Sequence, residues 1–324
     1  MKKILLFCLV ALVLFLSSCT VHESPEPLFE PEPVTTENRN VTGSRHSSGL
    51  TFRTYSDNTC EISEVNEADW GSTKMELPSH FEEYKIVAVD PGVFRDTSFS
   101  SIALPSELER IGEGAFEHAK LTEVVLPDTV TEIGKEAFAS CVQLEKVTLS
   151  KALTEIPEGA FYGCRSLRKI VIPEGVKVIG DEAFGDIPVL KQVTLPEGLE
   201  AIGGWAFWSC GIEKDGIEIP DSVAAIGKEA FASTPWLEAQ KEEWVIVGKG
   251  VLLRYNGTDS EITLPDRVLY LSNAFEKHDL KSLTLPDTLQ GIAPDALEGI
   301  SPDVIRYEGT SEEITALLPK KETP

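Results

Sequence analysis

The chain has 324 residues, and 42% of them are hydrophobic, so most of it can fold around an apolar interior. This length exceeds one compact core of usual size and suits two ordinary domains or one elongated array. The charge is one-sided, with 53 acidic against 29 basic residues and a formal net charge of −24. Such a field repels phosphate backbones and anionic lipid, which makes nucleic acid and electrostatic membrane docking poor hypotheses.

Residues 1–18 have the pattern of an export signal, with lysines at positions 2 and 3 and an apolar stretch over 4–16. That stretch is short for a membrane span. It ends in the letters LSSC at 16–19, which resemble the bacterial lipobox. The resemblance implies that Cys19 is acylated and becomes the mature N-terminus, where several acyl chains anchor stably. Thr20 stands where enterobacterial lipoproteins retained at the inner membrane have aspartate, so we expect export to the outer-membrane surface.

The lipidated cysteine begins a spacer over residues 19–50 that is rich in Pro, Glu, Ser and Thr and poor in apolar residues. Such a segment cannot bury enough surface to offset the cost of ordering it. We predict a disordered tether, partly extended by its Glu-Pro content, that presents a folded body away from the membrane.

The octapeptide IGKEAFAS occurs at 133–140 and again at 226–233, and both copies belong to a shorter period. The phenylalanine of this unit recurs at steps of 22 to 24 residues, with one step of 44. The copies are Phe94, Phe116, Phe138, Phe161, Phe184, Phe207, Phe231 and Phe275, with Leu297 as a weaker ninth copy. An independent register of Leu-Pro or Ile-Pro pairs runs from Leu104-Pro105 to Leu285-Pro286. A period of 20–29 residues with leucines spaced this way indicates a leucine-rich solenoid.

One turn explains the pattern physically. In the stretch 144–149, Leu144, Val147 and Leu149 are expected to face inward from a short strand. Lys146 and Thr148 are then expected to face outward, and the proline that usually follows ends the strand. No turn can cover its own apolar side, so each must be covered by the turns stacked on it.

The full unit, L-P-x-x-V-x-x-I-G-x-x-A-F-x-x-C, resembles the BspA-like, Treponema-type leucine-rich repeat of bacterial surface proteins over about residues 75–308. The resemblance implies a right-handed solenoid, mainly β, with a parallel sheet on its concave face and short helical or irregular convex segments. It also implies a non-catalytic surface protein, without a cofactor, that binds a protein ligand such as host matrix or another bacterial surface protein.

The predicted boundaries follow from the same unit. An N-terminal cap is expected at 51–90, repeats at 91–308, and a C-terminal cap and tail at 309–324. The pattern breaks at 234–260, which doubles one step of the register. This island is predicted to form a short helix followed by a hairpin that turns at 248–250.

Chemistry-bearing residues are few. Cys141, Cys164 and Cys210 occupy one slot in different turns, and the first two would lie about 5 Å apart, within disulfide range. We expect buried free thiols, because other turns fill this slot with small or apolar residues; a Cys141–Cys164 disulfide is the alternative. Histidines are scattered, and neither metal-ligand spacing nor a phosphate loop appears, so the sequence favours neither an enzyme nor a metal site.

Two candidate binding surfaces follow the strands. Thr148 and Thr194 belong to an outward row beside Lys146 and Lys169, which suggests a shallow groove for a protein or a glycan. The alternative is that β-branched residues simply suit strands. Acidic residues also follow the Leu-Pro or Ile-Pro pairs: Asp128, Glu174, Glu197, Asp221, Asp266 and Asp287. Stacked turns would align these acids along one edge. The edge could simply be solvated, or it could bind a basic ligand or hold calcium loosely.

Aromatic residues form the third candidate surface. Trp205 stands in a slot that other turns fill with Gly or Glu, and Trp208 follows the core residue Phe207. Tyr162 occupies the slot of Trp208 two turns earlier. Exposed tryptophans are favoured binding anchors, although these rings could instead cover a gap at Gly203-Gly204. Three hypotheses for function therefore stand: a protein-binding adhesion module, an envelope spacer without a dedicated ligand, and glycan capture.

Overall fold

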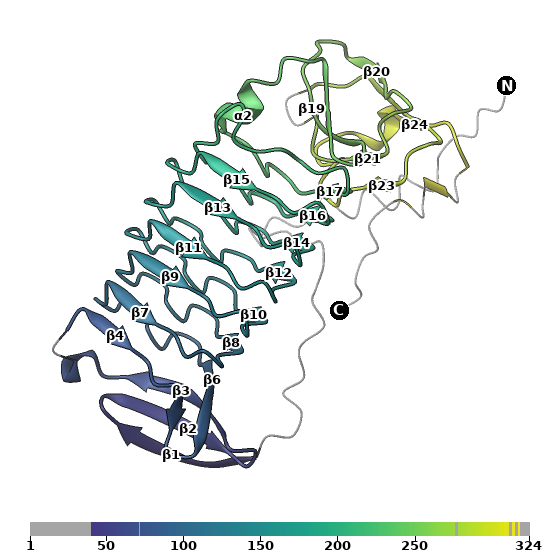
Figure 1. Cartoon of the computed structure of the whole chain (residues 1–324). Helices are drawn as coiled ribbons and strands as arrows, with labels where there is room; N and C mark the ends of the chain where they lie inside the picture. Colours follow the sequence, from purple (N-terminus) through teal and green to yellow (C-terminus); the bar gives the residue numbers. More distant parts are fainter. Residues whose placement is uncertain (1–39, 71, 276–277, 311–312, 315–316, 318–324) are drawn as a thin grey trace.

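The computed structural model describes residues 40–70, 72–275, 278–310, 313–314 and 317. The predicted export signal, Cys19 and the tether as far as residue 39 lie outside these residues, as does most of the predicted tail. The described chain winds into an elongated stack of turns, with antiparallel strands at one end and a displaced group of turns at the other (Figure 1). This solenoid of stacked parallel strands with little helix confirms the predicted fold class.

Each regular turn contributes a strand of three or four residues to a parallel ladder that we call the strand face. The middle residue of each strand points inward, as at Val124, Ile170 and Val193, and its neighbours point to solvent. The strands are β4 (Lys74–Glu76), β7 (Ser101–Ala103), β9 (Glu123–Val125), β11 (Lys146–Thr148), β13 (Lys169–Val171), β15 (Gln192–Thr194), β20 (Glu261–Thr263), β22 (Ser282–Leu285) and β24 (Ile305–Tyr307).

A second parallel ladder of two-residue strands, the short ladder, runs along the other side of the stack. Its members are β8 (Arg110–Ile111), β10 (Glu132–Ile133), β12 (Glu155–Ile156), β14 (Val178–Ile179), β16 (Ala201–Ile202), β17 (Ala225–Ile226), β21 (Tyr270–Leu271) and β23 (Gly291–Ile292). The family resemblance implied short helical or irregular segments on this side. Close approach of neighbouring turns makes the ladder possible, because a Cβ added at Gly134 would lie 2.4 Å from the backbone nitrogen of Glu113.

A column of phenylalanines fills the interior between the two ladders. The seven rings are those of Phe94, Phe116, Phe138, Phe161, Phe184, Phe207 and Phe231, and each is at most 1% exposed. Adjacent ring centroids lie 5.1–5.5 Å apart, with planes within 10° of parallel. Since burial of one such side chain stabilises by roughly 1.5–3 kcal/mol, the column is a main source of stability.

Both ladders are interrupted beside the turn that carries β11 and β12. β10 and β12 belong to different sheets, and so do β11 and β13. In other turns a glycine amide bonds the preceding turn, as Gly180 N donates to Ile156 O at 2.7 Å. Pro157 holds the equivalent position and has no N–H to donate. The interior continues regardless, because Phe138 and Phe161 stack at 5.3 Å.

The N-terminal end begins earlier than the sequence analysis placed it. The tether was predicted to continue to residue 50, but β1 (Val41–Ser47) already pairs in antiparallel fashion with β2 (Leu50–Tyr55), which pairs with β3 (Thr59–Val65). β1 is polar and almost wholly exposed, so its sequence lacks the apolar alternation that indicates a strand. Cross-strand contacts such as Thr42 Oγ1 to Thr54 Oγ1, at 2.9 Å, hold it.

The remaining elements of this end connect it to the stack. A 3-10 turn η1 (Glu67–Asp69) precedes β4, while β5 (His80–Phe81) forms a hairpin with β6 (Tyr84–Val89). β6 bridges β3 and β8, which joins the antiparallel strands to the short ladder. β4 pairs with β7 on the strand face. The repeats therefore start inside the cap that was predicted at 51–90.

The predicted island has the predicted elements. A short helix α2 (Pro235–Glu238) is followed by an antiparallel hairpin of β18 (Trp244–Val247) and β19 (Val251–Tyr255). The hairpin turns at 248–250, where both glycines have positive φ. β19 also pairs in parallel with β21, so the island supplies a strand to the short ladder.

The apolar interior divides at this island, which the sequence analysis did not anticipate. Trp236 of α2 packs on Phe231 with ring centroids 4.9 Å apart and closes the column. Phe275 was predicted as its next member, but it lies in a second apolar cluster against Tyr255, at 5.8 Å. That cluster extends to Ile305 and Ile314 beyond the 3-10 turn η2 (Pro302–Val304).

The four cysteines of the described chain are buried and free, which confirms the expected thiols. Cys141 and Cys164 do not form the alternative disulfide. Each thiol instead points back to the preceding turn: Cys141 Sγ donates to Phe116 O at 3.0 Å and Cys164 Sγ to Phe138 O at 3.2 Å. Burial raises the pKa of Cys141 to about 12, so this thiol is chemically quiet.

The phenylalanine column makes a direct stability prediction. Phe161→Ala removes a fully buried ring between two stacked neighbours, so it should lower the free energy of unfolding by about 3–5 kcal/mol, measured by denaturant titration. Val142→Ala, at a side chain that is 51% exposed, is the control and should change little. Equal, small effects of both changes would contradict the assigned interior.

Candidate functional site

The strand face carries a row of small and β-branched side chains on successive turns, which we call the Val/Thr stripe: Ala103, Val125, Thr148, Val171 and Thr194. β9 and β11 align Val125 with Thr148, and β13 and β15 align Val171 with Thr194. All five side chains are exposed. Figure 1 shows their strands following one another along one side of the stack. The two threonines predicted as binding residues are therefore brought into one row.

The stripe is unusual for its exposed valines. Val125 is 51% and Val171 61% exposed, and within the described residues only Val41 and Val142 are comparable among large hydrophobic side chains. The outward position of each strand is fixed by the inward position of its middle residue, so this exposure follows from the register. A row of apolar groups held in water is a feature of interaction surfaces.

A basic margin runs along the side of the stripe where the strands begin. Lys146 forms an ion pair with Glu123, and Lys191 forms one with Glu213 at 2.7 Å. Arg168 and Lys169 are exposed, and within the described residues neither has an ion-pair partner. The structure thus places Lys146 and Lys169, both predicted as site residues, beside the stripe.

An acidic margin lies where the strands end. Glu174 and Glu197 are exposed, and no acid–base pair involves them in the part of the chain described. Asp128 continues this margin but is bound to Lys151 at 3.1 Å, and that hydrogen bond lowers the pKa of Asp128. The predicted line of acids is therefore interrupted by one lysine.

Trp205 is not a free anchor. Its backbone is in the left-handed region, with φ of 51°, at a position that Gly159 fills with φ of 60°. The half-buried indole donates from Nε1 to Glu229 Oε2 at 3.2 Å, and the Lys228 ammonium lies 5.9 Å from its ring centroid. Lys228 in turn bonds Glu298 at 2.6 Å, across to the C-terminal turns. Trp205 therefore packs at the junction between the two groups of turns.

Trp208 and Tyr162 share another column, in the slot after the core phenylalanine, on the turns either side of Gly185. The Tyr162 ring leans over that glycine, since a Cβ added at Gly185 would lie 3.1 Å from Tyr162 Cδ2. Both aromatic side chains are half-buried. No ring contact links them to each other or to Trp205 within the described residues, so the three predicted aromatics do not form one patch.

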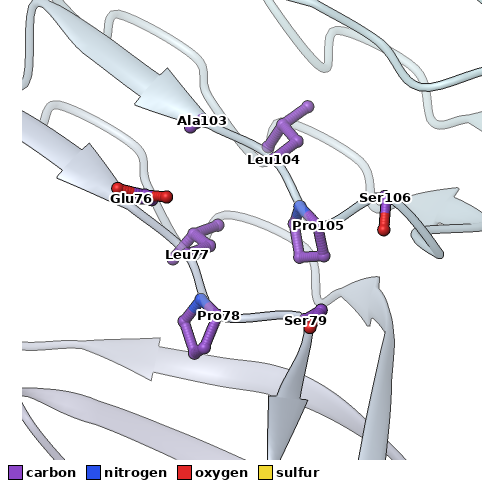
Figure 2. A pocket seen from close by; sticks show the side chains of 8 residues that line it. All are labelled: Glu76, Leu77, Pro78, Ser79, Ala103, Leu104, Pro105 and Ser106. Atoms are coloured by element: carbon purple, nitrogen blue, oxygen red, sulfur yellow. The ribbon is translucent and has the colours of Figure 1, made fainter.

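A shallow groove of about 480 Å³ lies at the first two turns and was not predicted from the sequence (Figure 2). Its walls are two successive corners, Leu77-Pro78 and Leu104-Pro105. The corners separate because the chain after Pro78 leaves the stack to form the β5–β6 hairpin. Leu77-Pro78 is one more Leu-Pro pair, N-terminal to the series that starts at Leu104-Pro105. This pair could have been used to predict the additional turn.

The carboxylate of Asp181 is buried two residues after β14 of the short ladder. Asp181 is 9% exposed and accepts a hydrogen bond from Gly204 N at 2.6 Å. Burial, with repulsion from Glu158, Glu182 and Asp295, raises its pKa to about 6. Within the described residues no group of three or more His, Cys, Asp or Glu side chains is arranged to hold a metal ion, and none of the helices there is long and apolar enough to span a membrane.

The repeat is shared with a known family. The pattern of the BspA type leucine rich repeat region matches residues 87–213, 154–243 and 253–316, with six copies and more than half of the chain. The chain belongs to this family. The stacked turns, the exposed strand face and the phenylalanine column described above are therefore its repeat architecture in this sequence.

Solved structures agree with the fold. A leucine rich cell surface protein from Faecalibacterium prausnitzii A2-165 is 19% identical, with a TM-score of 0.56 over 88% of this chain and 100% of its own. A leucine-rich repeat protein from Eubacterium ventriosum is 23% identical, with a TM-score of 0.52 over 62% of this chain and 52% of its own. None of the curated proteins matches this sequence.

Asp181 makes a pH-dependent prediction. Its native pKa of about 6 lies above the ordinary value near 4, so the native state holds this proton more tightly than the unfolded state. The free energy of unfolding must therefore fall as pH rises from about 4 to about 6. Asp181→Asn keeps an acceptor for Gly204 N and removes the charge, so its melting temperature should exceed the wild-type value at pH 7.5 and match it near pH 4.

Asp215→Asn, at an exposed turn, is the matched control for this comparison. A melting-temperature difference for Asp181→Asn that is the same at both pH values would contradict the assignment.

Proposed function

We propose that the protein is a lipid-anchored, non-catalytic module of the bacterial surface whose strand face binds another protein. The observation that carries this proposal is the Val/Thr stripe, where apolar side chains remain exposed between a basic and an acidic margin. Burying such a row against a complementary surface removes apolar area from water, which is the main driving force of association. Repeat solenoids commonly bind through extended faces of this kind.

The anchoring part of the proposal rests on the lipobox-like LSSC at 16–19 and the spacer that follows it. The described chain begins at Asn40, at the antiparallel end of the stack, so a tether attached there leaves the strand face free along its length. The Faecalibacterium protein of similar fold is described as a cell surface protein, which supports export.

The non-catalytic part rests on the arrangement of reactive groups. Cys141 and its equivalents are buried with raised pKa values, and His118 lies exposed beside Asp96. Neither kind of group lines the groove of Figure 2. The shallow groove of Figure 2 is lined by leucine, proline, serine, alanine and a single acid, Glu76, which is a poor set for catalysis.

Trp208 and Tyr162 are a second candidate contact, because two half-buried aromatic rings flank a glycine without a side chain. Aromatic faces of this kind favour the apolar faces of sugars, so glycan capture is the second candidate function at this column. An envelope spacer that binds nothing remains the structural alternative, and the experiment below separates the three.

The chain from Thr20 onward, which keeps every described residue, should be immobilised and exposed to surface-protein and glycan preparations from host matrix and bacteria. Val171→Asp places a charge within the stripe and should reduce protein capture at least tenfold, while Val142→Asp, at a comparably exposed site off the stripe, should not. Capture unaffected by Val171→Asp but lost with Trp208→Ala would favour the glycan reading. No capture by the wild type would favour the spacer.

A further inference from the structure

We infer that the partner of the Val/Thr stripe is a second copy of the same chain, packed face to face with both stacks running in the same direction. This inference rests on the strand face being the binding surface proposed above. It names the occupant of that surface and the orientation in which it binds.

The stripe is self-complementary in shape. Its side chains are small or β-branched, and the strands that carry them are held by parallel pairing. Two such faces related by a two-fold axis along the stripe place each side chain opposite its own copy. Val171 then packs on Val171 and Thr148 faces Thr148, which buries the two exposed valines of each face.

The order of charge across the stripe selects the direction. On the β13 turn, Arg168 and Lys169 precede the stripe and Glu174 follows it, while on the β15 turn Lys191 precedes it and Glu197 follows. Rotation about an axis along the stripe brings the basic margin of one copy onto the acidic margin of the other. An antiparallel arrangement would place basic on basic and acidic on acidic, which opposes pairing.

These charges cannot satisfy one another within one chain. Val171 and its strand separate Lys169 from Glu174, and neither forms an ion pair within the described residues. On the β9 and β11 turns the equivalent charges are neutralised internally, as Glu123 by Lys146 and Asp128 by Lys151. Unpaired charges of both signs therefore remain on the β13 turn, whereas on the β15 turn Lys191 pairs with Glu213 and only Glu197 is without an ion-pair partner among the described residues.

The energetics fit a weak, oriented contact. Ion pairs at a solvated rim add little affinity and mainly fix the orientation of the two copies. The formal net charge of −24 opposes pairing of two copies, but charges more than about 8 Å apart are largely screened at 0.15 M salt. Two copies tethered to one membrane gain effective concentration, which compensates for a small interface.

The parallel orientation of the two stacks determines which copies of the chain can meet. Parallel stacks place the two antiparallel N-terminal ends, and with them both attachment points, at the same end of the pair. The contact therefore joins neighbouring copies on one membrane and does not bridge two cells.

Symmetric cross-linking tests the pairing. In the chain from Thr20 onward, Thr148→Cys and Thr194→Cys each place a thiol on the two-fold axis, where it faces its own copy. Mild oxidation should then give a disulfide-linked dimer in high yield, and the buried native thiols should not compete. Val142→Cys, exposed off the stripe, measures random collision and should give at least tenfold less dimer. Equal yields at the three positions would overturn the inference.

Charge reversal tests the direction, using sedimentation of the same chain at 0.15 M salt. Lys169→Glu should weaken self-association at least fivefold, because it places an acid opposite Glu174 of the other copy. Adding Glu174→Lys should restore it, since the reversed pair is again complementary. Failure of the double variant to recover would overturn the parallel arrangement.

The outcomes also separate this inference from the proposed function. Capture of a foreign protein that is lost in Val171→Asp, together with background cross-linking at Thr148→Cys, would retain the strand face as a binding surface and refute the second copy as its occupant. Specific cross-linking without foreign capture would support self-pairing alone.

Discussion

Each turn of this chain is too short to cover its own apolar side chains, so every turn must be covered by the two turns stacked on it. The phenylalanine column is the clearest expression of this constraint, because each ring between Phe94 and Phe231 has a parallel neighbour about one strand spacing away. Backbone hydrogen bonds run in the same direction, as Phe116 N donates to Ala137 O at 2.8 Å. Interior and backbone therefore repeat together, and the outward positions are left free to vary.

The outward positions of the strands are therefore the ones that can carry a binding function. The inward residue of each strand is fixed by the interior, whereas the outward row holds Val, Thr or Glu in different turns without effect on the core. Two departures from the repeat shape the result. Pro157 interrupts the short ladder without disturbing the column, and Trp236 closes the column so that the C-terminal turns form their own interior. The strand face outside the island thus extends from β4 to β15, with one break in its pairing between β11 and β13.

The periodicity of the sequence predicted the features that follow from packing within the stack. These are the phenylalanine positions, the outward positions of Lys146 and Thr148, the island hairpin and the free thiols. The periodicity could not predict features that depend on pairing with a distant segment. The polar strand β1 exists only because β2 lies beside it, and Phe275 leaves the column because the island displaces its turn. Trp205 looked exposed in one turn, but Glu229 and Lys228 of the next turn engage its ring.

Hydrogen exchange of the wild-type chain, followed by mass spectrometry, tests the shared interior most directly. In a stack whose turns depend on their neighbours, end turns open before middle ones. Peptides that contain Phe138, Phe161 or Phe184 should therefore exchange slowest, with protection falling toward Phe94 and toward the island. Uniform exchange along the column, or faster exchange in its middle than at its ends, would contradict the account.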